Sequence, residues 1–134
     1  MELLALKLAQ ARGVLYPEEV FRQIEALHAV PSLINGVLAG ADDIQDVAAR
    51  YVKTRDFFFL GRGVGYPVAL EGALKLKEIS YARAEAYPAG EMKHGPIALI
   101  EPGTVVVAVA SRGHLHAKIM SNIDEVRALS LIHI

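Results

Sequence analysis

The chain has 134 residues, of which 53% are hydrophobic, and its 14 basic and 15 acidic side chains leave a net charge of −1. This length predicts one domain with a sizeable core, and the balanced charge without a basic patch excludes a nucleic-acid partner. The absence of cysteine excludes disulfides and thiolate metal sites. No apolar run reaches the roughly 18 residues of a membrane helix, so we expect no membrane partner and a cytoplasmic location.

The first third of the chain is predicted to be helical. Prolines followed by helix formers open two of the helices, glycines follow the ends of others, and an aspartate at position 42 or 43 caps the last. The second proline, Pro31, predicts that a separate short helix starts there. The four predicted helices cover residues 2–12, 17 to about 28, 31 to about 38 and 42 to about 53.

Strands and helices alternate in the rest of the chain. Residues 57–60 form a continuous apolar run, typical of a parallel strand covered on both faces, and residues 104–110 repeat it. A long helix is predicted between them over about 67–85, and another follows over about 114–129. The alternation predicts an α/β fold with an incomplete, doubly wound and mainly parallel sheet flanked by helices. The high hydrophobic fraction predicts surface that meets a partner or another domain.

Charged residues recur at helical spacing in the long helix. Glu71, Lys75 and Glu78 fall at i, i+4 and i+7, which places them within about 60° of one another on one helix face. Such groups are ordinarily solvent-exposed ion pairs, and spacing alone favours that interpretation. A carboxylate beside an ammonium group is also the arrangement that moves a proton next to a developing oxyanion.

The helix leads into a loop, YPAGEMKHGP, at residues 87–96. Two prolines and two glycines fix an irregular backbone around His94, and stiff loops of this kind often carry function. Histidine gives or accepts a proton near neutral pH without tuning. A capping or surface role is the alternative for His94.

The sequence Gly61-Arg62-Gly63 follows the first predicted strand, where α/β folds place phosphate sites. A tight strand-to-helix turn explains both glycines without a ligand and is the favoured interpretation. Arg62 is then either an interface residue or a weakly supported substrate-binding cation. The histidines at 28, 114 and 116 form no cluster of three or four ligands, so we expect neither a metal nor a cofactor.

Residues 57–109 resemble the second sugar-isomerase (SIS) domain of the glutamine–fructose-6-phosphate aminotransferase (isomerizing) family, with EGALKLKE and GEMKHGP as the most specific strings. Upstream, HAVPSLINGVL is similar to the segment that joins the two isomerase domains of that family. The resemblance implies that residues 1–40 are an end helix of the first SIS domain plus the interdomain segment. Residues 41–128 are then a truncated second SIS domain. Residues 129–134 depart from the family pattern and are interpreted as a non-native tail, with simple divergence as the alternative.

The resemblance also implies roles for individual residues. Glu78 matches the carboxylate that moves the proton between C1 and C2 of the sugar, and Lys75 matches a lysine one turn before it. His94 matches the histidine that opens the furanose ring in the neighbouring subunit's active site, which implies a homodimer. A glutamate that acts as a base near neutral pH needs burial to raise its pKa, with a nearby lysine to limit the rise. Glu71 has no chemical role beyond pairing with Lys75.

The family converts fructose 6-phosphate and glutamine to glucosamine 6-phosphate and glutamate. This chain resembles neither its glutaminase half, which uses a cysteine, nor its Ser/Thr-rich phosphate loop, nor its C-terminal lysine tail. We therefore expect an isomerase-domain fragment that is inactive alone, with glutamine handled by a missing glutaminase domain. The alternatives are a non-catalytic phosphosugar-binding SIS domain and a stand-alone phosphosugar isomerase or deglycase. The first would carry a DNA-binding helix-turn-helix and the second its own phosphate loop, and neither is visible in the sequence.

Overall fold

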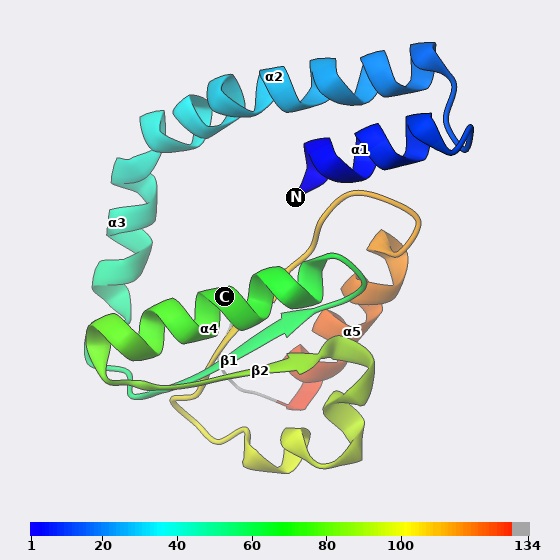
Figure 1. The fold of residues 1–134 in the computed structure, drawn as a ribbon. Coiled ribbons are helices and arrows are strands. Elements are labelled where there is room, and N and C mark those ends of the chain that lie inside the picture. The colour runs from blue at the N-terminus through cyan, green and yellow to red at the C-terminus, as the bar shows by residue number, and fades with distance from the viewer. Residues whose placement is uncertain (130–134) are drawn as a thin grey trace. The chain divides into compact units, whose positions relative to one another are not determined.

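The computed structural model describes residues 1–129, which form two compact units (Figure 1). The first unit is Met1–Ala49, and the second begins at Arg50. Residues 130–134, which make up nearly all of the predicted non-native tail, lie outside the described residues. The division between domains at residue 40 that the sequence implies stays a prediction.

The first unit is helical, as predicted. It contains α1 (Glu2–Ala11), α2 (Pro17–Ala39) and most of α3 (Ala41–Arg50). Glu19 completes the start of α2, because its carboxylate accepts a hydrogen bond of 2.8 Å from the backbone N–H of Tyr16. The prediction of a separate helix starting at Pro31 is wrong, since Pro31 lies inside α2. Proline removes one backbone donor, and the helical residues on both sides keep the rest of the hydrogen-bond ladder.

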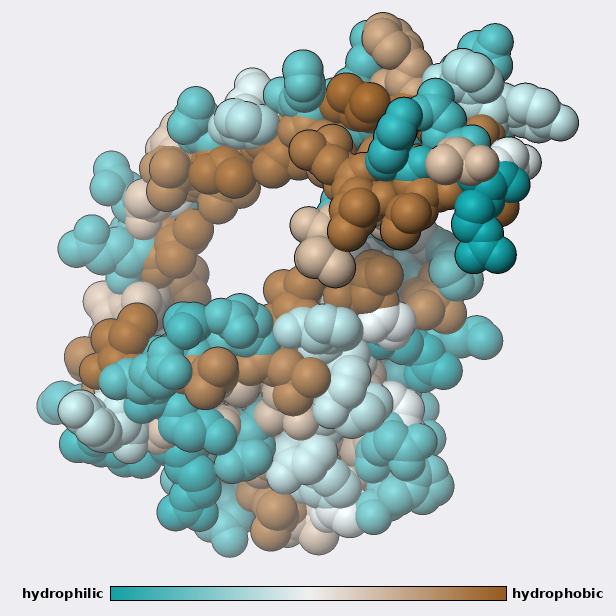
Figure 2. Space-filling view, viewed as in Figure 1, coloured by the Kyte–Doolittle hydropathy of each residue, from teal (hydrophilic) through white to brown (hydrophobic). Residues whose placement is uncertain are grey.

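The second half of α2 exposes an apolar face. Leu33, Ile34, Val37 and Leu38 are between 53% and 67% exposed, and Figure 2 shows hydrophobic surface along this helix. Within residues 1–129 no single helix is long and apolar enough to cross a membrane. The pair α2 and α3, bent by 52° at their junction, reaches that length and composition only when taken together.

The second unit is built on a three-stranded parallel sheet, which confirms the predicted fold class. Its strands are β1 (Asp56–Gly61), β2 (Arg83–Pro88) and β3 (Val105–Val109), in the order β2-β1-β3. β1 is central: Phe58 is opposite Glu85 on β2 and opposite Val106 on β3. In the described part of the chain, β2 and β3 therefore form the two edges of the sheet.

The strand β2 was not predicted. The long helix was expected to run to about residue 85, but α4 (Gly65–Ser80) ends earlier, where Tyr81 adopts a left-handed conformation with φ of 57°. In β2 the alanines at 84 and 86 point inward, whereas Arg83 and Glu85 are exposed. Alanine, arginine and glutamate all favour helices, so composition hides a period-2 pattern that spans only a few residues.

Helical segments cover both faces of the sheet. α4 packs on one face, where Phe59 lies against Gly72. The other face carries α5 (His116–Leu129) and two short 3-10 helices, η1 (Ala89–His94) and η2 (Pro96–Leu99). Successive strand residues point to opposite faces, and Leu60 therefore points away from α4. The core on that side consists of Leu60, Ala89, Met92, Ile119 and Val126, each at most 4% exposed.

Candidate functional site

The charged residues of α4 share one face, as their spacing predicts. Lys75 Nζ lies 2.8 Å from Glu78 Oε2 and 3.7 Å from Glu71 Oε1. The hydrogen bond with Glu78 raises the pKa of Lys75, and the charges of both carboxylates add to this shift. The arrangement therefore places an ammonium group beside the Glu78 carboxylate.

The burial that a glutamate base requires is not supplied by the described residues. The side chain of Glu78 is 52% exposed and that of Lys75 is 53% exposed. The expectation of a buried base is therefore not met by the described residues of the second unit taken by themselves.

His94 is the last residue of η1 and is exposed. The predicted irregular loop is a pair of 3-10 helices joined at Gly95, whose φ of 141° is unfavourable for residues with a side chain. Two residues before His94, Met92 is buried in the core at 2% exposure. The imidazole therefore lies at the surface, on a segment whose inner side is packed.

The fold places Glu78 and His94 at opposite ends of the strands. β1 and β2 are parallel, so α4 between them runs in the opposite direction, and its last turn, with Glu78, lies where the strands begin. η1 follows the end of β2, so His94 lies beyond the edge where the strands end (Figure 1). A helix of this length spans about 24 Å. The structure brings Lys75 and Glu78 together, and it does not bring His94 to them within one copy.

The turn after β1 accounts for its glycines without a ligand. A Cβ at Gly61 would collide with the backbone of Gly65, and Gly63 has a φ of 55°. Both observations favour the tight-turn interpretation. The half-buried side chain of Arg62 donates a hydrogen bond from Nη1 to Oδ1 of Asn122 on α5, at 3.1 Å.

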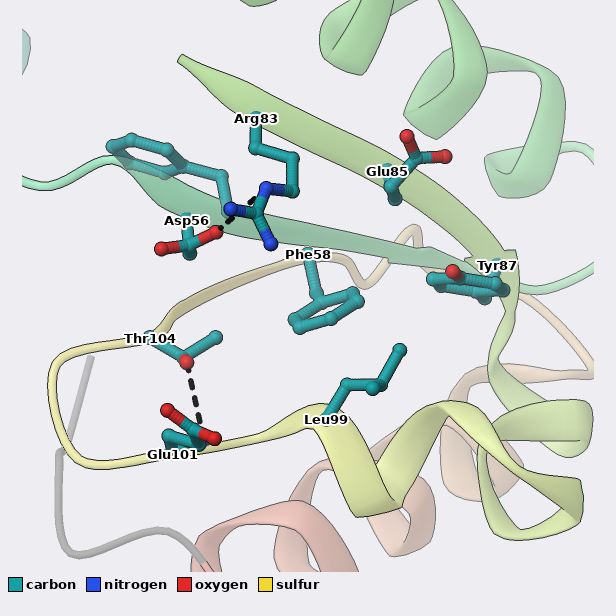
Figure 3. Close-up of a pocket in the computed structure, with 9 residues that line it drawn as sticks. Asp56, Phe58, Arg83, Glu85, Tyr87, Leu99, Glu101 and Thr104 are labelled. Carbon is teal, nitrogen blue, oxygen red and sulfur yellow. Dashed lines mark hydrogen bonds and ion pairs between the residues drawn. The ribbon is translucent and has the colours of Figure 1, made fainter.

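A pocket of about 270 Å³ lies on the α5 side of the sheet (Figure 3). The rings of Phe58 and Tyr87, with centroids 5.6 Å apart, face Leu99. At its rim, Arg83 Nε lies 3.2 Å from Asp56 Oδ1. Sequence reasoning missed this pocket, because its residues come from three separate segments and one of them is the unpredicted strand β2.

None of the predicted site residues lines this pocket. Its other lining residues are Phe57, Glu85, Glu101 and Thr104. Among residues 1–129 there is also no group of three histidine, aspartate or glutamate side chains arranged to hold a metal ion.

A model of the SIS domain family matches residues 51–133, so the chain belongs to the SIS domain family. The glutamine–fructose-6-phosphate aminotransferase (isomerizing) of Mycolicibacterium smegmatis is 53% identical over 94% of this chain and 21% of its own length. The corresponding aminotransferase of Thermus thermophilus is also 53% identical, over 96% of this chain and 21% of its own length.

A solved structure supports the fold. The C-terminal domain of glucosamine-fructose-6-phosphate aminotransferase from Francisella tularensis matches with a TM-score of 0.92 and 40% identity, over 95% of this chain and 36% of that chain. The chain thus spans about a fifth of the length of the curated relatives it matches. The family and fold implied by the resemblance are confirmed.

Proposed function

We propose that this chain is the proton-transferring part of a glutamine–fructose-6-phosphate aminotransferase, which converts fructose 6-phosphate and glutamine to glucosamine 6-phosphate and glutamate. The observation that carries this proposal is the 53% identity to a relative of that name over 94% of the chain. The pairing of Lys75 with Glu78 at 2.8 Å supports the chemistry, because it joins a carboxylate base to a cation.

In the proposed reaction the Glu78 carboxylate accepts a proton from C1 of the sugar and returns it to C2. The Lys75 ammonium group lies beside that carboxylate and stabilises the negative charge that develops on oxygen during the transfer. Glu71 contributes only its ion pair with Lys75, at 3.7 Å. Arg62 is assigned no contact with the sugar in this reaction, since its hydrogen bond goes to Asn122 within the second unit.

His94 opens the furanose ring in the proposed reaction, and it does so in the site of a second copy. Glu78 and His94 lie at opposite ends of the strands, so one copy cannot present both to the same sugar. In a homodimer, the His94 side chain of each copy can reach the site that contains Glu78 of the other copy, which removes this obstacle. The second copy also adds protein surface near the half-exposed Glu78.

The proposed enzyme is cytoplasmic, uses no cofactor, and has neither a nucleic-acid nor a membrane partner. It takes ammonia from glutamine through a glutaminase domain that is not among these 134 residues. The phosphate of the sugar is held outside this chain as well. We therefore expect the isolated chain to be inactive.

A chimera tests the function. Residues 1–129 replace the matching stretch of the M. smegmatis relative, and glucosamine 6-phosphate formation is measured for the chimera and for its Glu78→Gln and His94→Gln variants. Both substitutions should lower kcat by a factor of about 10² or more, the effect of losing an acid–base group. Glu71→Gln is the matched control, since it removes a carboxylate from the same lysine and should keep kcat within about twofold. A fully active Glu78→Gln chimera would refute the proposal and favour a phosphosugar-binding role without catalysis.

Mixing two inactive variants tests whether His94 of one copy acts in the active site of the other copy. Glu78→Gln and His94→Gln chimeras are unfolded together in equal amounts and refolded. The mixture should regain about a quarter of the activity, because half of the dimers formed at random are mixed and each mixed dimer has one complete site. Activity no higher than that of the separate variants would mean that Glu78 and His94 act from the same copy or not at all.

A further inference from the structure

The segment that carries His94 is fixed to the rest of the second unit by its apolar residues. Ala89 and Met92 of η1 are buried at 1% and 2% exposure, and they pack in the core with Leu60 of β1. A 3-10 helix has poor internal hydrogen-bond geometry, so its shape depends on what it packs against. Because η1 is packed on its inner side only, the position of its exposed end, with His94, depends on further contacts.

A series of polar contacts supplies that further support. Arg62 at the end of β1 donates a hydrogen bond to Oδ1 of Asn122, at 3.1 Å. Nδ2 of Asn122 donates to Oε2 of Glu125, at 3.3 Å. The other carboxylate oxygen of Glu125, Oε1, lies 2.9 Å from Nζ of Lys93, the residue before His94. These four residues (Arg62, Asn122, Glu125 and Lys93) form a polar brace from β1 across α5 to η1.

Near the beginning of η1, Gly90 leaves space for the guanidinium group of Arg62. A Cβ at Gly90 would lie 3.1 Å from Nη1 of Arg62, closer than ordinary packing contacts. The lack of a side chain at Gly90 therefore lets the guanidinium lie against η1. Arg62 is half-buried there, with Gly90 on one side and Asn122 as its hydrogen-bond acceptor.

Within the second unit, η1 is thus contacted at both ends by one connected set of side chains. Arg62 reaches Gly90 near its start, and Glu125 reaches Lys93 near its end. The hydrogen bond with Lys93 lowers the pKa of Glu125, in keeping with the close contact between these two side chains. The set involves neither Lys75 nor Glu78.

We propose that the polar brace positions His94, so that Arg62, Asn122, Glu125 and Lys93 are positioning residues of the reaction rather than contacts to the sugar. This inference rests on the proposed function of His94. Proton transfer requires a donor and an acceptor within about 3 Å, and a displacement of about 1 Å can lower the rate by two orders of magnitude. The polar brace limits such displacement of η1 without touching the substrate.

The first test uses the chain itself. Amide hydrogen exchange is measured by NMR at Met92, Lys93 and His94 in the wild type and in Glu125→Gln and Arg62→Met variants. Exchange at Lys93 and His94 should accelerate about tenfold in both variants, since each loses a charge-assisted hydrogen bond. Arg83→Gln is the control, because it removes an ion pair on β1 and β2 that lies outside the polar brace. Unchanged exchange in both variants would overturn the proposal.

The second test uses the chimera with the M. smegmatis relative. Glu125→Gln and Arg62→Met should lower kcat about 10- to 100-fold with KM within about twofold, because the sugar contacts are intact and only the placement of His94 changes. Arg62→Lys keeps a donor for Asn122 and should restore part of kcat. Thermal unfolding of the same variants shows whether any loss of kcat comes from lost folding.

The outcomes separate the two proposals. A fully active His94→Gln chimera would overturn the proposed function, and the positioning role with it. An inactive His94→Gln chimera beside fully active Glu125→Gln and Arg62→Met chimeras would overturn the positioning role alone. A loss of kcat that Arg62→Lys does not reduce, accompanied by a lower unfolding temperature, would likewise count against positioning.

Discussion

The two proposed halves of the site differ in how they are held. His94 follows a segment with a buried inner side and polar contacts at both of its ends. Glu78 and Lys75 are about half exposed, and their ion pairs are with charged side chains of the same helix. The histidine segment is thus held by contacts within the second unit, whereas the same unit leaves the carboxylate about half exposed.

The largest effect on stability is expected from a substitution that disrupts the packing of η1, the segment that carries His94. Met92→Ala should lower the free energy of unfolding by about 2–5 kcal/mol, because it removes a fully buried side chain and leaves a cavity. Met120→Ala is the matched control on α5, where the methionine is 39% exposed, and it should cost clearly less. Urea unfolding followed by circular dichroism measures both. Equal losses of unfolding free energy for Met92→Ala and Met120→Ala would mean that the packing of Met92 stabilises the fold no more than that of a partly exposed side chain.

A smaller effect is expected where Arg62 approaches η1. Gly90→Ala should cost about 1 kcal/mol, because the new Cβ displaces the guanidinium and weakens its hydrogen bond with Asn122. Gly36→Ala is the control, since a Cβ there meets nothing within 4 Å and alanine in a helix is favoured over glycine by about 0.5–1 kcal/mol. The two substitutions should therefore have opposite signs in urea unfolding. Stabilisation by both would show that Arg62 is not held in place.

The contribution of the ion pair between Glu125 and Lys93 to the free energy of unfolding should depend on pH. The folded state lowers the pKa of Glu125 from its ordinary value of 4.5. Its contribution is therefore present above that value and is lost as the pH falls through the lowered pKa. Glu125→Gln should be less stable than the wild type at pH 7, and the difference should vanish in strong acid. Asp124→Asn, an exposed neighbour on α5, should show no such change, and a difference that persists in acid would argue against the ion pair.

The smallest effect is expected on α4. Glu78→Gln and Lys75→Met should leave the urea midpoint of the chain nearly unchanged, and added salt should not alter the comparison, because exposed ion pairs contribute little and are screened. This result would sharpen the contrast, since the proposed catalytic residues of α4 would contribute almost nothing to folding. A marked loss of stability would instead mean that the group is a structural ion pair, the interpretation that its spacing alone favours.

Much of the fold follows from local patterns in the sequence. The apolar run of β1 and the valines of β3 predict parallel strands, and the structure confirms both, with β3 only half-buried after Val105. The helix from Pro17 was recognised by its start, whereas Pro31 misled because proline usually begins or ends a helix. β2 was missed since its inward residues are alanines and the turn before it uses Tyr81 instead of glycine.

The candidate site was predictable to a lesser degree. The shared face of Lys75 and Glu78 follows from helical spacing, and the structure confirms it. The polar brace was not predictable, because Arg62 and Asn122 are 60 positions apart and meet only after β1 and α5 pack. The exposure of Glu78 also could not be read from the sequence, as burial depends on which surface covers a helix.

The outer edge of β3 has a practical consequence. In the described part of the chain, this strand of four valines and one alanine has a neighbour on one side only. A strand edge of this composition readily accepts a strand from another molecule and resembles the short segments that stack into fibrils. Preparations of these residues alone are therefore at risk of aggregation on concentration.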